Sequence, residues 1–212
     1  MLRTHNCGEL RSSHKESQVT LCGWVDQVRD MGQLFFIVLR DRYGVTQCLV
    51  DKTDLEESSE LLKLTKSIRY EDCLQLAGTV GLRGEKDRNQ KQATGDVELI
   101  VSKIKVLNGS KTLPFPVRDD HQASDELRLK HRYLDLRRPK MQKNMMTRHQ
   151  VIQAIRDVLV EQGFLEIETP LLIRSTPEGA RDFLVPSRTH QGKFYSLPQS
   201  PQLYKQILMM SG

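Results

Sequence analysis

The stretch GFLEIETPLLIRSTPEGARDFLVPSRTHQGKFYSLPQSPQLYK, residues 163–205, decides the fold of the C-terminal part of the chain. It predicts a strand that ends at Thr169-Pro170, a polar loop, two short strands and the start of a helix. Pro170 cannot donate a ladder hydrogen bond, so it belongs at the end of a strand or at a sheet edge.

A long amphipathic helix is predicted directly before this stretch, over residues 145–162. Met145, Ile152, Ile155 and Leu159 keep the spacing of one helix face. Gly163 then ends the helix, because glycine readily adopts the left-handed conformation that closes a helix C-terminus.

The N-terminal half alternates between apolar runs and turns. Residues 18–50 predict three strands, residues 55–68 a short helix, and residues 73–82 and 96–107 two more strands. This is the order of an OB-fold, a small five-stranded barrel that binds oligonucleotides across one face. On the pattern alone, a barrel that binds nucleic acid and a barrel without a ligand are equally acceptable.

A linker rich in proline and polar residues covers residues 108–125 and marks a domain boundary. Between Arg128 and Arg148 there are eight basic residues and one acidic residue. Structural ion pairs on a solvated helix are one interpretation, and a surface for nucleic-acid phosphates is the other, which we favour because of the flanking domains.

Composition limits the classes of function. The 212 residues carry a net charge of +5 with a pI near 9.0, which suits an anionic partner. No apolar run reaches the roughly 18 residues that a membrane span needs, and no secretory signal is visible. The cysteines lack metal-ligand spacing and are expected to be reduced thiols, and the histidines form no cluster, so we assign no catalytic or metal-binding residue. The cysteines are Cys7, Cys22, Cys48 and Cys73.

Several motifs together resemble one family, the class II aminoacyl-tRNA synthetases, and within it the bacterial-type aspartyl-tRNA synthetases. FLEIETP is similar to the class II dimer motif, TPEGARDFLVPSR to a substrate loop and strand, and LPQSPQLYK to the aspartate-binding strand. GWVDQVRDMGQLFFIVLRDRYGVTQ is similar to the family's anticodon-binding barrel. The resemblance implies an α+β chain with an OB-fold barrel at residues 1–108, a linker and hinge at 109–142 (the hinge segment below), and the start of an antiparallel-sheet catalytic domain at 143–212.

The resemblance also implies which residues read the anticodon. Phe36 matches the aromatic residue on which a base stacks, and Arg29, Gln47 and Glu98 match the polar readers. Phe35 is expected in the barrel core, because neighbouring residues on a strand face opposite ways.

For the amino acid, the resemblance implies contacts from Glu178, Ser200, Gln202 and Lys205. A carboxylate such as Glu178 suits the substrate ammonium group. The ammonium group of Lys205 favours aspartate over asparagine, because the amide would leave it poorly paired. Pro170 is expected at the subunit contact.

The implied function is ATP-dependent ligation of L-aspartate to tRNA-Asp by a homodimer that uses ATP and Mg²⁺. The second and third class II motifs, which hold ATP, do not occur in these residues, so we expect a fragment that binds tRNA and does not activate aspartate alone. The location is expected to be the cytoplasm, or alternatively the mitochondrial matrix. A non-catalytic RNA-binding descendant is the alternative, and Lys205 within QSPQLYK argues against an asparaginyl or lysyl enzyme.

Overall fold

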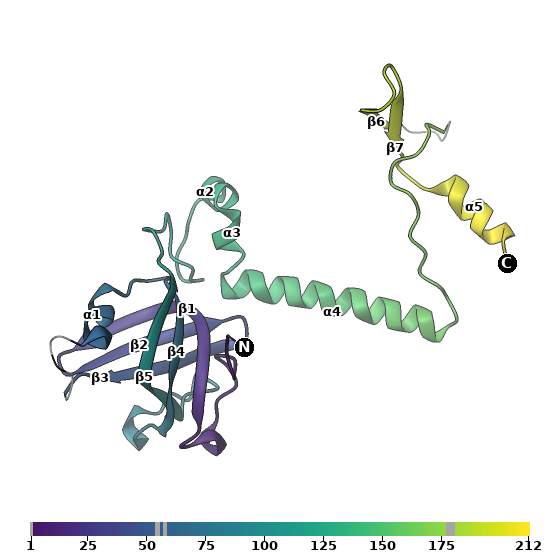
Figure 1. Cartoon of the computed structure of the whole chain (residues 1–212). Helices are drawn as coiled ribbons and strands as arrows, with labels where there is room; N and C mark the ends of the chain where they lie inside the picture. The colour runs from purple at the N-terminus through teal and green to yellow at the C-terminus, as the bar shows by residue number, and fades with distance from the viewer. Residues whose placement is uncertain (1, 54–55, 57–58, 177–180) are drawn as a thin grey trace. The chain divides into compact units, whose positions relative to one another are not determined.

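A computed structural model describes residues 2–53, 56, 59–176 and 181–212. The chain divides into two compact units, residues 1–143 and residues 144–212, and each is described by itself. Figure 1 labels the helices and strands of both. Within the described ranges no helix is both long enough and apolar enough to cross a membrane.

The first unit is built on a closed barrel with the strand order β1-β2-β3-β5-β4 (Figure 1). Strand β3 pairs with β5 in parallel, and the other four pairings are antiparallel. The predicted OB-fold is confirmed. The strands are β1 (Gln18–Met31), β2 (Leu34–Asp41), β3 (Gly44–Asp51), β4 (Cys73–Leu82) and β5 (Val97–Asn108).

Alternation along the strands decides which side chains enter the barrel core. On β2, Phe35 is 5% exposed and belongs to the core cluster, whereas Phe36 is only half-buried. Successive side chains of a strand point to opposite faces, so burying Phe35 leaves Phe36 on the outer face. The expected burial of Phe35 is confirmed.

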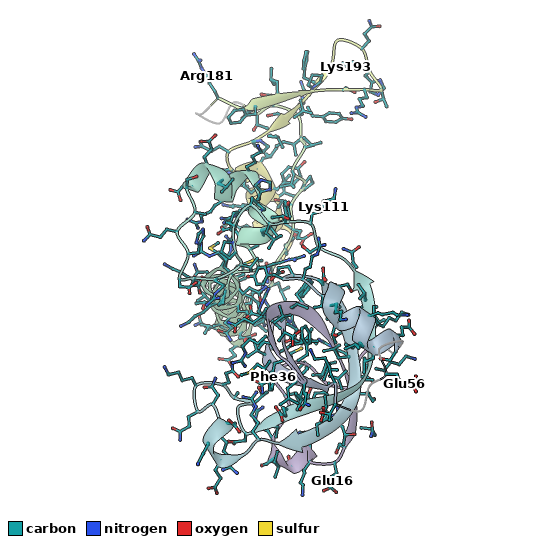
Figure 2. All side chains as sticks on the ribbon, turned by 90° about the vertical axis from the view of Figure 1, so that its left-hand side faces the viewer. Glu16, Phe36, Glu56, Lys111, Arg181 and Lys193 are labelled. Atoms are coloured by element: carbon teal, nitrogen blue, oxygen red, sulfur yellow. The ribbon has the colours of Figure 1, made fainter. Side chains whose placement is uncertain are left out.

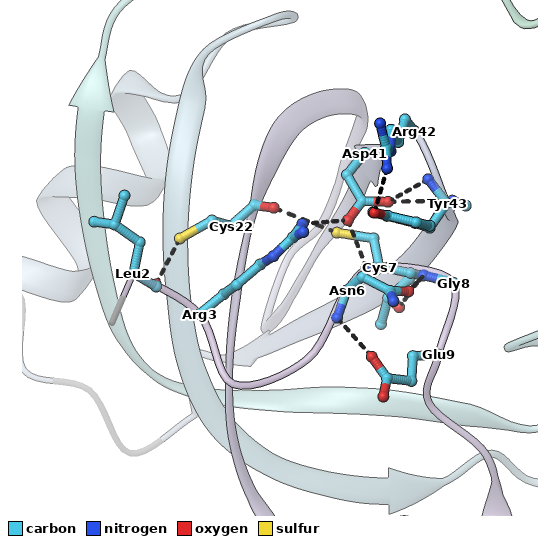
Figure 3. A network of polar contacts seen from close by, with 12 residues as sticks. Leu2, Arg3, Asn6, Cys7, Gly8, Glu9, Cys22, Asp41, Arg42 and Tyr43 are labelled. Atoms are coloured by element: carbon cyan, nitrogen blue, oxygen red, sulfur yellow. Dashed lines mark hydrogen bonds and ion pairs between the residues drawn. The ribbon is translucent and has the colours of Figure 1, made fainter. Parts of the chain in front are cut away.

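Asp41 connects the N-terminal segment to the turn between β2 and β3 through hydrogen bonds (Figure 3). Its carboxylate accepts hydrogen bonds from Arg3 Nη1 at 2.9 Å, Cys7 N at 2.9 Å and Tyr43 N at 2.8 Å. Gly8 lies so close to this turn that an added Cβ would sit 2.2 Å from the Tyr43 carbonyl oxygen. Only glycine therefore fits there without a backbone shift.

Helix α1 (Glu60–Ser67) is shorter than the helix predicted at residues 55–68. Ser59 is its N-cap, and the hydroxyl accepts a hydrogen bond from Leu62 N at 3.1 Å. Leu61 and Leu64 pack against the barrel core. Short 3-10 helices lie at Ser12–His14 and Glu85–Asp87.

The hinge segment carries two short helices, α2 (Asp125–Lys130) and α3 (Arg132–Asp135). A small apolar cluster of Phe115, Val117 and Leu134 forms its own core. The backbone N–H of Val117 donates to the hydroxyl of Tyr70 at 2.9 Å, which ties the segment to the barrel.

Helix α4 (Pro139–Glu161) begins earlier than the predicted residue 145. Proline is accommodated there because the first turn of a helix has no intrahelical partner for its N–H. In the second unit, β6 (Phe183–Pro186) and β7 (Phe194–Leu197) form the two predicted short antiparallel strands. Helix α5 (Gln202–Met210) follows them, as predicted.

The prediction of a strand that ends at Thr169-Pro170 is wrong. Residues 164–170 have no regular secondary structure. A strand needs a neighbour to pair its N–H and C=O groups, and no described strand lies beside this segment. Instead, Arg156 of α4 holds Glu166 through two hydrogen bonds, at 2.7 Å from Nε and 2.9 Å from Nη2.

Candidate nucleic-acid interface and substrate pocket

The four residues expected to read the anticodon lie on four different strands of the barrel. Arg29 on β1 is paired directly with Phe36 on β2, and Gln47 on β3 is paired with Val38, two residues further along β2. Glu98 comes from β5, next to Leu99, which pairs with Cys48 on β3. The register therefore aligns these residues across one outer face.

Hydrogen bonds join three of these side chains into one row. Arg29 Nη2 donates to Gln47 Oε1 at 3.1 Å, and Gln47 Nε2 donates to Glu98 Oε2 at 2.9 Å. The Arg29 guanidinium also lies over the Phe36 ring, 5.5 Å from its centroid. The amide orientation of Gln47 is thereby fixed by a donor on one side and an acceptor on the other.

A pocket of about 560 Å³ is lined by this row and by the loop after β4. All four predicted residues contribute to it, and Phe36, labelled in Figure 2, forms part of its wall. The volume is that of a small-molecule site, which is large enough for one or more nucleobases. The loop supplies the polar residues Asp87, Asn89 and Gln92.

Arg83 is a candidate binding residue that sequence reasoning did not find. It is 6% exposed, it lines the same pocket, and its Nε donates to the Val97 carbonyl oxygen at 2.9 Å. Its Nη2 is buried with no hydrogen-bond partner among the described residues. Burial lowers the pKa of the guanidinium. An arginine just after a strand predicts an exposed side chain, so the sequence carried no signal for it.

The chemistry of this pocket suits a nucleobase. An aromatic ring offers a stacking surface, and the row beside it offers donors from Arg29 and acceptors from Glu98. The unused donor on Arg83 costs free energy while it is buried and unpaired, and a base carbonyl or phosphate oxygen would satisfy it.

Four of the eight basic residues between Arg128 and Arg148 form ion pairs, and all four are arginines. Asp135, which is fully buried, accepts hydrogen bonds from Arg128, Arg132 and Arg138. The hydrogen bond from Arg128 is the main reason that the pKa of Asp135 lies below its usual range. These arginines stabilise the hinge segment. Of the two interpretations of the stretch, structural ion pairs therefore explain most of its arginines, and a phosphate-binding surface does not.

In the second unit, three of the four residues expected to bind the amino acid lie around the start of α5. Gln202 is the first residue of α5, Lys205 lies one turn later, and Ser200 precedes the helix. Gln202, Lys205 and Pro170 are exposed, and Ser200 is half-buried. Glu178 lies outside the described residues. Across the part of the chain that is described, no group of three or more His, Cys, Asp or Glu side chains is placed to hold a metal ion.

Two family models match the chain. Residues 19–107 match the "OB-fold nucleic acid binding domain", and residues 124–212 match "tRNA synthetases class II (D, K and N)". The first region covers the barrel pocket, and the second covers α2 to α5.

Curated relatives align over the whole chain. An aspartate–tRNA(Asp/Asn) ligase of Desulfatibacillum aliphaticivorans is 53% identical over 212 residues, which is 100% of this chain and 35% of the relative. An aspartate–tRNA ligase of Shouchella clausii is 50% identical over 212 residues, covering 100% of this chain and 36% of the relative. The chain thus spans about a third of the length of these relatives.

Solved structures share the fold. Asparaginyl-tRNA synthetase from Pyrococcus horikoshii, complexed with asparaginyl-adenylate, is 27% identical with a TM-score of 0.82, covering 99% of this chain and 46% of that one. Aspartyl-tRNA synthetase from Entamoeba histolytica is 26% identical with a TM-score of 0.75, covering 97% of this chain and 42% of that one.

Proposed function

We propose that the barrel of this chain reads the anticodon of tRNA-Asp. The proposal is supported by the match of residues 124–212 to the class II tRNA synthetase model, by the match of residues 19–107 to the nucleic-acid-binding OB-fold model, and by the alignment of the chain with aspartate–tRNA ligases. The observation that carries the proposal is the hydrogen-bonded row Arg29–Gln47–Glu98 beside the Phe36 ring. A stacked base next to Phe36 would place its edge against this row. The buried donor of Arg83 then serves a second base or its phosphate.

The test is binding of a tRNA-Asp transcript to the 212-residue chain at two salt concentrations. Phe36→Ala should weaken binding by roughly fivefold to 150-fold, because stacking of a base on an aromatic ring contributes roughly 1–3 kcal/mol. Tyr43→Ala is the matched control, since Tyr43 is a 51% exposed ring on the same barrel that does not line the pocket. A transcript with a changed anticodon should bind wild type as weakly as the natural transcript binds Phe36→Ala.

If neither Phe36→Ala nor a changed anticodon alters the affinity, the barrel binds RNA only through its positive charge and does not read the anticodon. Arg83→Lys gives a second measurement at the same site. It keeps the charge but loses the fixed guanidinium geometry, so it should also weaken anticodon-dependent binding.

We further propose that residues 163–205 supply part of an aspartate pocket, with contacts from Glu178, Ser200, Gln202 and Lys205. The support is the resemblance of these motifs and the clustering of three of the residues around the start of α5. Amide NMR shifts at Gln202 and Lys205 should respond to L-aspartate more than to L-asparagine, and Lys205→Met should remove the difference. Equal shifts with both amino acids would contradict the proposed aspartate pocket.

ATP and Mg²⁺ belong to the proposed ligase reaction of the complete enzymes. The described residues include no cluster of acidic side chains suited to Mg²⁺. The proposal therefore gives no residue of this chain a role in binding ATP or Mg²⁺.

A homodimer is the proposed assembly. In the second unit, α4 and the segment after it expose Ile155, Phe164 and Leu165 at 55%, 60% and 85%, beside an apolar pocket of about 270 Å³. Apolar surface of this kind marks an interaction site. Pro170 is proposed to lie at the same contact. Sedimentation of the chain should show a dimer that Ile155→Glu dissociates, and a monomer at all concentrations would count against it.

A further inference from the structure

A second pocket of the first unit lies between the segment after α1 and the start of the hinge segment. It has a volume of about 340 Å³, with Arg69 and Tyr70 on one wall and residues 110–113 and 116 on the other. It shares no lining residue with the pocket around Phe36. Nothing in the proposed reading of the anticodon uses it.

Hydrogen bonds hold both walls of this pocket in place. Asp72 is 5% exposed, and its carboxylate accepts from Arg69 N at 2.7 Å and from Ser110 N at 2.6 Å. Tyr70 OH accepts a hydrogen bond at 2.9 Å from the N–H of Val117, the residue that follows Pro116 of the second wall. The pocket is therefore preformed, which lowers the entropic cost of binding a ligand.

The lining of the pocket includes two exposed cationic side chains. Arg69 and Lys111 are exposed, and neither has an ion pair among the residues that the structure describes (Lys111 is labelled in Figure 2). The two acidic residues that follow Tyr70 in the chain, Glu71 and Asp72, bind other partners. Glu71 is paired with Arg40 and Arg137, and Asp72 accepts the two backbone N–H groups.

The lining of the pocket combines an aromatic ring with apolar side chains. Tyr70, Leu113 and Pro116 all contribute to this lining. The Tyr70 hydroxyl already accepts one hydrogen bond, so its own proton is available to donate. A lining that offers an aromatic ring, apolar side chains and two cations suits a ligand with a planar ring and an attached anion.

We propose that this pocket binds one unstacked nucleotide of an RNA strand, with its phosphate between Arg69 and Lys111 and its base against Tyr70 and Pro116. The proposal goes beyond the anticodon pocket and does not depend on it. A volume of about 340 Å³ accommodates a single nucleotide and excludes a duplex.

The test compares two charge reversals of equal size in the full chain. Arg69→Glu/Lys111→Glu changes the pocket, and Lys103→Glu/Lys105→Glu changes two exposed lysines on β5 that line neither pocket. Binding of a fluorescent tRNA-Asp transcript should fall about tenfold further in the pocket variant, because it loses close phosphate contacts as well as net charge. The neutral variant Arg69→Gln/Lys111→Gln should show a smaller loss in the same direction. Equal losses in the two reversals would overturn the proposal.

Free ligands distinguish the source of the nucleotide. Amide NMR shifts of Arg69, Ser110 and Lys111 are followed with adenosine 5′-monophosphate, inorganic phosphate and the transcript. Shifts caused by the mononucleotide would support the site. Shifts caused by the transcript but not by the mononucleotide would also support it, and would show that the bound nucleotide belongs to an RNA strand. Identical shifts with phosphate and mononucleotide would overturn it, since the base would then make no contact. Phe36→Ala should leave the shifts with the mononucleotide unchanged, so failure here is separable from failure of anticodon reading.

Discussion

The guanidinium of Arg137, in the hinge segment, stacks on the indole ring of Trp24 on β1, with Cζ 4.7 Å from the ring centroid. The same arginine donates from Nη1 to Glu71 Oε2 at 3.0 Å, and the other oxygen of Glu71 is paired with Arg40. Glu71 is 4% exposed and Arg40 is 8% exposed. A buried carboxylate thus joins β2 to the hinge segment and holds the hinge segment against the barrel.

Glu71→Gln should destabilise the first unit by about 3 kcal/mol, because removing one partner of a buried pair leaves the other charge uncompensated. Trp24 is the single tryptophan of the chain, so urea unfolding followed by its fluorescence reports on this unit. Glu16→Gln is the control, since Glu16 makes an exposed ion pair with Lys15 at 3.1 Å. It should change stability by less than about 1 kcal/mol. Equal effects of the two substitutions would contradict the assignment.

Asp135 should make the stability of the first unit depend on pH. Its pKa is lowered in the folded state by Arg128 first and by the other arginines, so its stabilising contribution is fully present above its unfolded pKa of about 4. That contribution is lost as the pH falls through the lower, folded pKa. Asp135→Asn should therefore cost roughly 2 kcal/mol at pH 7 and progressively less below pH 4. A cost that is independent of pH would show that the ion pairs contribute nothing.

Gly8→Ala should destabilise the first unit by about 2 kcal/mol, because the new Cβ would meet the Tyr43 carbonyl oxygen at 2.2 Å and overpack the turn. Gly109→Ala is the matched control. The nearest atom to a Cβ there is Asp72 Oδ1 at 4.0 Å, so stability should change little. Thermal unfolding of both variants, followed by Trp24 fluorescence, measures the difference, and a neutral Gly8→Ala would refute the close packing.

The cysteines should react in two classes with a thiol reagent. Cys7 and Cys48 are fully buried, and burial raises the pKa of both thiols, so they should react only after unfolding. Cys22 and Cys73 are half-buried, and burial raises their pKa as well. They should react in the native chain at a rate that increases with pH, as the thiolate fraction grows. A native Cys22→Ser/Cys73→Ser variant that still reacts quickly would contradict this division.

Local patterns in the sequence were sufficient to predict most elements of the barrel. The apolar runs and turns identified β1 to β5 in order. The family resemblance placed Phe36 on the outer face, and strand alternation then placed its neighbour Phe35 in the core. Periodicity identified the body of α4, and the helix start expected within residues 163–205 corresponds to the beginning of α5. Each of these depends on residues close together in the chain, and the relevant side-chain period is set by backbone geometry alone.

Contacts between distant residues were decided only by the tertiary structure. Arg29, Gln47 and Glu98 form one row because the parallel pairing of β3 with β5 brings together strands far apart in sequence. Arg83 is buried although its type predicts exposure. The strand expected before Pro170 is absent from residues 164–170, because a strand forms only where another strand pairs with its backbone. Residue pattern determines which face of an element is apolar, but the partner that covers that face or pairs with that edge is chosen by the packing of the whole chain.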